Sequence, residues 1–393
     1  MKRILSALTL GAGLGAAVLT GTAAPAAAES LKVGFLATLS GPPAVLGQHM
    51  RDGFLLAVKQ ANGRLGGIET EVIVVDDELK PDGAITKVQG LLERDKVDIM
   101  AGVVFSNVMM AVYKPIIQSE TIFIGANAGP SPIAGRGCSP YFFSTSYQND
   151  QNHEVMGRYA SQKGYDKVVV MAPNYQAGKD AVAGFKRHYS GTVAQEIYTK
   201  LGQLDFSAEL ARIADEQPDA LFTFMPGGMG VNLVKQYSQA GLKDVIPFLS
   251  TFTVDETTLP ATKDMAVGLY SGAEWASDID NEANARFVRA FEAEYGYPPS
   301  LYAAQGYDAA RLIDGAVSMA GGVQDKKSLL SALAAAPFES VRGDFRFNNN
   351  QFPIQDFYLV EAVKRAEGKY VTQLVEKVFD DVGDAYSGSC HMK

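Results

Sequence analysis

The sequence predicts an α/β protein built from two lobes. Short apolar strand patterns alternate with amphipathic helix patterns along almost the whole chain, as parallel sheets with helical crossovers require. The chain has 393 residues, which is more than one hydrophobic core usually serves. No low-complexity linker separates the two halves, so we expect a hinge between the lobes and not a flexible tether.

The first α/β unit is predicted over residues 31–142. Leu46, Met50, Phe54 and Val58 recur at the spacing of one helix face, directly after an apolar strand pattern. The predicted strands are 32–39, 71–75, 97–104 and 121–125, and the predicted helices begin near 46, 81 and 107.

The second unit, residues 148–272, repeats this alternation. Its predicted helices are 153–163, 178–189, 206–216 and 231–240, and its predicted strands are 167–171, 192–198, 220–224 and 245–249.

The last part of the chain does not resemble a third free-standing domain. Helices are predicted at 282–295, 302–320 and 327–335, followed by alternating segments at 340–347 and 357–363 that indicate an antiparallel pair. We expect this part to complete one of the first two lobes, which requires the chain to cross between lobes several times.

The N-terminus has the pattern of a secretory signal peptide over residues 1–28. Lys2 and Arg3 precede an apolar stretch, and Ala26 to Ala28 supply small residues for cleavage. A membrane anchor is the alternative, but Gly, Ala and Thr make the stretch weakly hydrophobic. We therefore expect an exported protein. Its net charge of -9 disfavours nucleic acid as a partner.

The two cysteines, Cys138 and Cys390, are predicted to form a disulfide, because an exported protein meets an oxidising compartment. Two free thiols are the alternative.

No catalytic or metal-binding pattern is found. His49, His153, His188 and His391 lack the spacing of zinc ligands and are interpreted as solvated or capping residues. The acidic run 76–78 could hold a metal, but a solvated strand end is favoured. We expect a binding protein without a catalytic residue, a metal or a cofactor, and not an enzyme.

Small and polar residues follow the predicted strands at residues 40–42, 105–107, 126–129 and 226–229. Ligands of open α/β sheets bind beyond the carboxyl ends of strands, where helix N-termini favour a carboxylate. Ser106 and Asn127 would add side-chain donors. The alternative is that these residues are ordinary caps and turns.

The order of three motifs resembles the solute-binding proteins of ABC importers, in the branched-chain amino acid binding branch. The motifs are KVGFLATLSGPPAVLG (32–47), DGFLLAVKQAN (52–62) followed by Gly66-Gly67, and YAAQGYD (302–308). The resemblance covers essentially the whole chain after residue 28.

The resemblance implies the type I periplasmic binding protein fold, with two Rossmann-like lobes and three crossings near 143–147, 270–277 and 350–357. The first lobe would contain 29–146 and 278–352, and the second 147–277 and 353–393. It also implies a monomer in the periplasm that delivers a small ligand to an ABC permease of the inner membrane.

The resemblance also implies which residues bind the ligand. A ligand carboxylate would be held by the loops that contain Ser106-Asn107 and Ala126-Asn127-Ala128. The acid that usually holds an α-ammonium group is replaced by Ser250-Thr251-Phe252, although Asp255 and Glu256 follow closely.

The remaining predicted site residues are mostly apolar or aromatic: Leu46, Gly228, Met229, Phe252, Tyr175 and Tyr302. Such a slot is similar to that of the subgroup that takes up benzoates and hydroxycinnamates, because aromatic rings and Met suit a planar aromatic acid. Core packing is the alternative for each of these side chains. The alternative ligand is a branched-chain or other amino acid, and the alternative function is a ligand sensor for a signalling partner.

Overall fold

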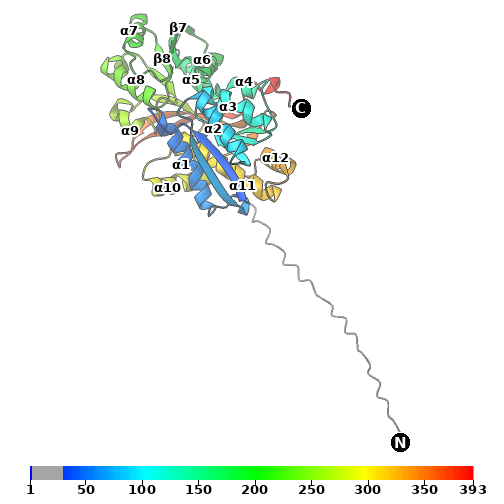
Figure 1. Ribbon diagram of the computed structural model, residues 1–393. Helices are drawn as coiled ribbons and strands as arrows, with labels where there is room; N and C mark the ends of the chain where they lie inside the picture. Colours follow the sequence, from blue (N-terminus) through cyan, green and yellow to red (C-terminus); the bar gives the residue numbers. More distant parts are fainter. Residues whose placement is uncertain (2–29, 393) are drawn as a thin grey trace.

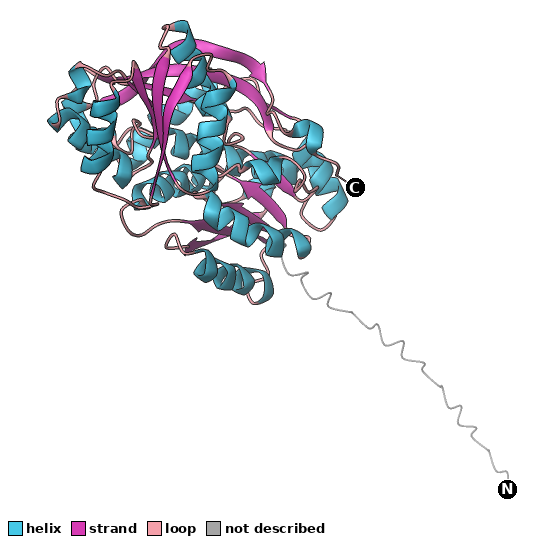
Figure 2. Ribbon diagram, turned by 90° about the horizontal axis from the view of Figure 1, so that it is seen from above, coloured by secondary structure: helices cyan, strands magenta, loops and turns pink. Residues whose placement is uncertain are grey.

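The computed structural model describes Met1 and residues 30–392, which form two lobes around two separate sheets (Figures 1 and 2). Apart from Met1, the predicted signal peptide lies outside the described residues. Within them, no helix combines the length and the hydrophobicity that a membrane crossing requires. The predicted fold class, two α/β lobes with parallel sheets, is confirmed.

The first lobe is centred on a parallel sheet with the strand order β2-β1-β3-β4-β5. Its strands are β1 (Ser30–Ala37), β2 (Glu69–Asp76), β3 (Ile99–Gly102), β4 (Ile122–Gly125) and β5 (Phe142–Ser144). Its helices are α1 (Ala44–Gln60), α2 (Pro81–Glu93), α3 (Ser106–Gln118), α4 (Ser131–Ala134), α10 (Glu282–Tyr295), α11 (Leu301–Ala320) and α12 (Lys326–Ala334).

Helices from the last third of the chain therefore return to the first lobe, where α11 packs along α1 (Figure 1). The two backbones approach closely at Gly53 and Gly306. A Cβ at Gly53 would lie 1.9 Å from the Ala303 carbonyl oxygen, and one at Gly306 would lie 1.9 Å from that of Met50. Only glycine fits at this crossing.

The second lobe carries a mixed sheet with the order β11-β12-β10-β9-β8-β6-β7, and β13 pairs with β12. Its parallel strands are β6 (Lys167–Pro173), β7 (Thr192–Thr199), β8 (Ala220–Phe224), β9 (Phe248–Thr251) and β10 (Tyr270–Ala273). Its antiparallel strands are β11 (Arg346–Phe347), β12 (Pro353–Lys364) and β13 (Tyr370–Val382). Its helices are α5 (Gln151–Gln162), α6 (Gln176–Arg187), α7 (Ser207–Glu216), α8 (Gly228–Gln239) and α9 (Leu259–Thr262).

Before the C-terminal tail, the chain crosses between the lobes three times, at residues 145–150, 274–281 and 335–352. These segments overlap or adjoin the three crossings that the sequence suggested.

A buried ion pair joins two of the crossings to α11. The Arg342 guanidinium lies 3.0 Å from the Asp308 carboxylate, and both side chains are almost completely buried. Arg342 also donates to the Ser146 carbonyl oxygen at 2.7 Å and to the carbonyl oxygen of Thr145. Through one side chain, the first crossing, the third crossing and a helix of the first lobe share a single network.

The C-terminal tail leaves β13 in the second lobe and returns to the first. Asn350 donates to Asp384 at 2.8 Å, and the predicted disulfide joins Cys138 to Cys390 across a sequence separation of 252 residues. The tail therefore forms a further covalent tie between the lobes.

The antiparallel pair was predicted wrongly in one respect. Strand β12 pairs with β13 along most of its length. Residues 340–347 are mostly turns and contribute only the two-residue β11, which pairs antiparallel with the first two residues of β12. Strand β13 escaped detection because few of its residues are buried and its pairing contains register shifts, which obscure the alternation. The segment predicted at 245–249 becomes strand only from Phe248 and runs to Thr251.

Replacing Arg342 by Met should lower the free energy of unfolding by about 3–5 kcal/mol, because Asp308 would remain buried without its cation. Urea unfolding followed by circular dichroism measures this. The matched control is Arg286→Met, which removes exposed ion pairs with Glu282 and Glu339 and should cost less than about 1 kcal/mol. Equal losses in the two variants would contradict the role given to Arg342.

Candidate functional site

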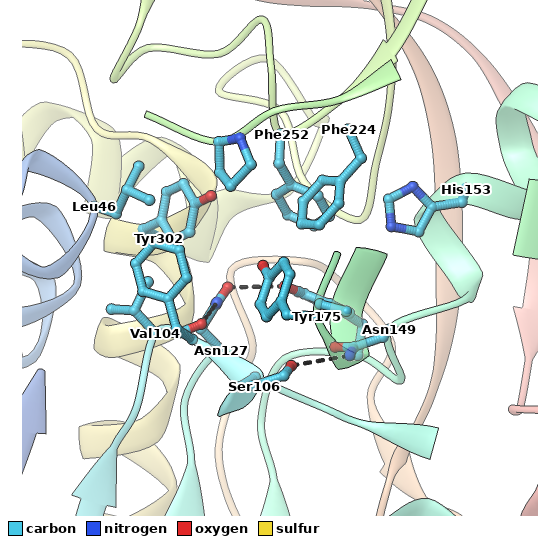
Figure 3. A pocket seen from close by; sticks show the side chains of 15 residues that line it. Leu46, Val104, Ser106, Asn127, Asn149, His153, Tyr175, Phe224, Phe252 and Tyr302 are labelled. Atoms are coloured by element: carbon cyan, nitrogen blue, oxygen red, sulfur yellow. Dashed lines mark hydrogen bonds between the residues drawn. The ribbon is translucent and has the colours of Figure 1, made fainter. Parts of the chain in front are cut away.

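A small cavity lies between the lobes, beyond the carboxyl ends of strands from both sheets (Figure 3). It is lined by Leu46, Val104, Phe105, Ser106, Asn127, Ala128, Tyr147, Asn149, His153, Tyr175, Ala177, Phe224, Pro226, Phe252 and Tyr302.

The wall formed by the first lobe carries the polar side chains. Asn127 donates its Nδ2 to the Val104 carbonyl oxygen at 2.7 Å and accepts from the Tyr147 hydroxyl at 2.9 Å (Figure 3). Asn149, in the first crossing, donates to the Ser106 hydroxyl at 3.1 Å (Figure 3). These bonds fix the orientation of both amides and of the serine.

Hydrogen-bond donors remain available at this wall. Ser106 accepts a bond through its oxygen, and its own hydrogen has no recorded acceptor among the described residues. Asn127 uses one of its two amide hydrogens. Ser106 is also the first residue of α3, whose opening turn has no side-chain cap. An anion placed here would meet a hydroxyl, an amide and a helix N-terminus together.

The wall formed by the second lobe is aromatic, and the rings of Tyr147 from the first crossing and Tyr302 from α11 pack against it. The rings of Phe224 and Phe252 lie 5.9 Å apart at 77°, and Tyr147 and Tyr302 lie 5.2 Å and 6.1 Å from Phe252. Tyr175 is nearly parallel to Phe224, with a centroid distance of 6.3 Å. Tilted and edge-on ring pairs of this kind leave ring faces that a planar ligand can contact.

The cavity lining carries no formal charge. It contains no Lys, Arg, Asp or Glu. Burial lowers the pKa of His153 to about 3, so its imidazole is neutral and shares a hydrogen bond with the Thr251 hydroxyl. Burial raises the pKa of the Tyr302 phenol, which therefore stays protonated. Every polar group here is a neutral donor or acceptor.

Strained backbone adjoins the cavity on both sides. Val103 has a φ of 75° and Phe252 a φ of 52°, in the left-handed region that side chains other than glycine's rarely adopt. Such conformations persist only where the surroundings enforce them, and they are concentrated at functional sites.

The lobes touch at the rim of the cavity. A Cβ added to Gly228, at the start of α8, would lie 3.1 Å from Pro42 of the first lobe. A Cβ on the preceding Gly227 would lie 3.4 Å from Pro43 and 3.5 Å from the Leu46 side chain. The structure is therefore a closed form, in which glycines permit the lobes to meet.

The profile of the periplasmic binding protein family matches residues 30–369. The chain belongs to this family. A solute-binding protein of an ABC transporter from R. palustris, solved in complex with benzoate, is 34% identical, with a TM-score of 0.86, and the match covers 91% of this chain and 99% of that one.

Two further matches agree with the family. The solute-binding protein from Rhodopseudomonas palustris BisB5, in complex with 3,4-dihydroxy benzoic acid, is 30% identical with a TM-score of 0.83, covering 91% of this chain and 99% of that one. The Leu/Ile/Val-binding protein homolog 6 of Brucella melitensis is 29% identical over 94% of this chain and 96% of its own length. The resemblance drawn from the motifs is thereby confirmed.

Seven residues predicted for the site of this binding protein do line the cavity: Leu46, Ser106, Asn127, Ala128, Tyr175, Phe252 and Tyr302. Among the others, Met229 is buried in the core of the second lobe, where its sulfur accepts a bond from the Gly202 N–H. Gly228 lies at the rim. Asn107 and Ala126 are not part of the lining.

The amides expected to hold a carboxylate after β4 are mostly engaged. The Ala126 N–H donates to the Gly102 carbonyl oxygen, and the Ala128 N–H to that of Val103, each at 3.0 Å. In this loop the Asn127 side chain keeps one amide hydrogen without a partner among the described residues.

The sequence analysis missed eight lining residues: Val104, Phe105, Tyr147, Asn149, His153, Ala177, Phe224 and Pro226. Phe105 and Pro226 belong to loops that were singled out, and Phe224 ends a predicted strand, so their positions were detectable. Asn149 lies in the first crossing and His153 follows it, and no sequence pattern distinguishes either residue.

The interpretation of the histidines as solvated or capping was wrong for two of them. His153 is 1% exposed and lines the cavity, and His49 is 6% exposed and packs against Tyr297. The acidic run 76–78 is not wholly solvated either, because Asp77 is buried and accepts a 2.6 Å bond from Thr38. Among the described residues no cluster of potential ligands is placed to hold a metal ion.

The two acids after β9 do not line the cavity. Glu256 turns toward β13, where it accepts bonds from the Thr372 N–H at 2.8 Å and hydroxyl at 2.7 Å. Asp255 accepts from Thr257 through one oxygen, and its second oxygen has no partner. Burial raises the pKa of Glu256 to about 7.

Replacing Glu256 by Gln should change how stability depends on pH. The carboxyl holds its proton more tightly in the folded state, so the stability it contributes is present below pH 4.5 and lost as the pH rises through 7. Relative to wild type, Glu256→Gln should gain up to about 3 kcal/mol of unfolding free energy between pH 4.5 and pH 8. Urea titrations at several pH values measure this. Exposed Glu93→Gln is the control, and parallel pH profiles for the two variants would contradict the prediction.

Proposed function

We propose that this protein is the extracytoplasmic solute-binding component of an ABC importer and that it captures a small aromatic carboxylate. The proposal rests on the separation of polar and aromatic side chains on different walls of the cavity. Uncharged donors cluster at the wall of the first lobe. The rings of Phe224, Phe252 and Tyr175 form the wall of the second, and the Tyr302 ring of α11 lies beside them. A benzoate-like molecule has the same division into an anionic end and a flat ring.

The carboxylate end would be held without a cation. Ser106, Asn127 and the opening turn of α3 supply the donors, and charge-assisted hydrogen bonds are about twice as strong as neutral ones. The benzoate and dihydroxybenzoate in the two related R. palustris structures support this class of ligand.

An amino acid would fit this cavity less well, because its ammonium group needs an acidic partner. Glu256 points away toward Thr372, and Asp255 is outside the lining. The aromatic side chains of the second lobe would leave that group desolvated and unpaired, which is costly.

Capture would work by a shift between open and closed lobes. A ligand that touches both walls binds the closed form more tightly and increases its population. We propose that a permease in the inner membrane recognises the closed monomer in the periplasm, after the signal peptide has directed export. No bond of the ligand would be broken, so the protein would not act as an enzyme.

The test is isothermal titration calorimetry of the mature chain with benzoate, 4-hydroxybenzoate, 3,4-dihydroxybenzoate, benzamide, leucine and valine. Benzoates should bind, and benzamide should bind roughly 10- to 100-fold more weakly, because a neutral amide forgoes charge-assisted hydrogen bonds. A ligand at about 100 times its Kd should add about 2.7 kcal/mol to the unfolding free energy in a parallel thermal-shift assay.

Binding of leucine or valine without any benzoate would refute the aromatic ligand while leaving the importer role. Failure of all six compounds to bind would refute the proposed ligand class.

Replacing Ser106 by Ala should weaken benzoate binding by about 10- to 100-fold, because a hydrogen bond to a charged group contributes roughly 1.5–3 kcal/mol. Calorimetry measures the loss. The matched control is Ser207→Ala, which removes the hydroxyl of the first residue of α7, an exposed helix start far from the cavity lining. Equal benzoate affinity in both variants would show that Ser106 does not bind the carboxylate.

A further inference from the structure

A buried carboxylate of the second lobe binds a helix start of the first. Asp180, on α6, is 3% exposed. Its two oxygens accept the Ser131 hydroxyl at 2.7 Å and the Ser131 N–H at 3.2 Å. Ser131 begins α4 in the first lobe, so these two bonds can exist only while the lobes are closed.

The same carboxylate reaches the cavity through one amide. Asn149 Nδ2 donates to Asp180 at 2.8 Å and to the Ser106 hydroxyl at 3.1 Å. Both amide hydrogens are therefore used, one on each side (Figure 3 shows the bond to Ser106). The Asn149 oxygen accepts the Gly129 N–H at 2.9 Å, which fixes the rotamer.

We propose that Asp180 is a positioning residue that couples lobe closure to the ligand-binding serine, an inference that rests on the proposed function. Together with Ser131 and Asn149 it forms the Asp180 latch. When the lobes close, the Asp180 carboxylate accepts a hydrogen bond from one amide hydrogen of Asn149. The second amide hydrogen then points at the oxygen of Ser106. The hydrogen of Ser106 is then directed toward the ligand.

Because Asp180 is buried, its contacts with Ser131 and Asn149 form together or not at all. Among the described residues, Asp180 has no Lys or Arg partner within salt-bridge distance. Its charge is compensated by hydrogen bonds from Ser131, Asn149 and Gln176, the last at 2.8 Å. A buried carboxylate that loses such donors is costly, whereas in an open form water would solvate it. Closure of the lobes is therefore favourable only when these donors point at Asp180. A ligand bound to Ser106 keeps one of them, the Asn149 amide, in that orientation. Binding and closure would stabilise each other by the same factor.

The test is a double-mutant cycle on ligand affinity with Asp180→Asn, Ser131→Ala and the combined variant. Each single variant should weaken binding of the ligand found by calorimetry by about 5-fold or more. The combined variant should lose little more than either alone, because both break the same contact. Stopped-flow measurements should show that the variants lose affinity through faster ligand dissociation, because the latch forms only after the ligand has bound to the open protein. Burial raises the pKa of Asp180, so the cycle is run at pH 8, because a higher pH favours the ionised carboxylate.

A matched pair elsewhere in the second lobe serves as the control. Asp205 accepts the Ser207 N–H at 3.0 Å and hydroxyl at 2.7 Å, the same chemistry within one lobe and at an exposed position. Asp205→Asn and Ser207→Ala should leave affinity unchanged. Additive losses in the Asp180 cycle, or an Asp180→Asn affinity equal to wild type, would overturn the latch.

The Asp180 latch and the proposed ligand class can be refuted independently of each other. If leucine binds in place of benzoates, the cycle is run with leucine, because the latch lies outside the aromatic wall. If no compound binds, hydrogen exchange of the Ser131 amide in the ligand-free protein decides. The latch predicts faster exchange in Asp180→Asn than in wild type or Asp205→Asn. Equal exchange in all three would overturn it.

Discussion

The arrangement of both lobes depends on one buried ion pair, Arg342–Asp308. It lies where the first and third crossings meet α11, and the remaining donors of the guanidinium satisfy carbonyl oxygens of the first crossing. A second buried carboxylate, Glu274, follows β10 and receives bonds from Asn152 and Gln305. Polar networks of this kind specify one geometry, because any misplaced member leaves a desolvated charge.

Helix α11 links this hinge to the cavity. Tyr302, Gln305 and Asp308 recur every three residues along it, and they contact the cavity, the second crossing and the third crossing in turn. The ring of Tyr302 is therefore held by the same helix that holds the hinge. A ligand contact at the ring and a change in lobe angle act on one rigid element, which gives closure a mechanical connection to binding.

Much of the fold could be predicted from the sequence, because each strand and helix carries its own periodicity. Element types in both lobes were predicted well, and helix α10 was predicted to the residue, since local spacing decides them. Strand β13 was missed because its pairing with β12 is non-local and its exposed residues alternate poorly. The site was predicted in part: the loops after β3 and β4 carry visible signals, whereas Asn149 and His153 acquire their positions only when the first crossing folds.

The sequence alone determined the alternation of strands and helices, the pairing of the two cysteines and the loops that end at the cavity. Only the tertiary structure decided which side chains of those loops face a ligand. Met229 lies in the first turn of α8 and packs in the core of the second lobe, whereas Phe252, directly after β9, lines the cavity. The physical reason is that side-chain direction at a loop depends on backbone angles, such as the φ of 52° at Phe252, and packing between distant segments sets these angles.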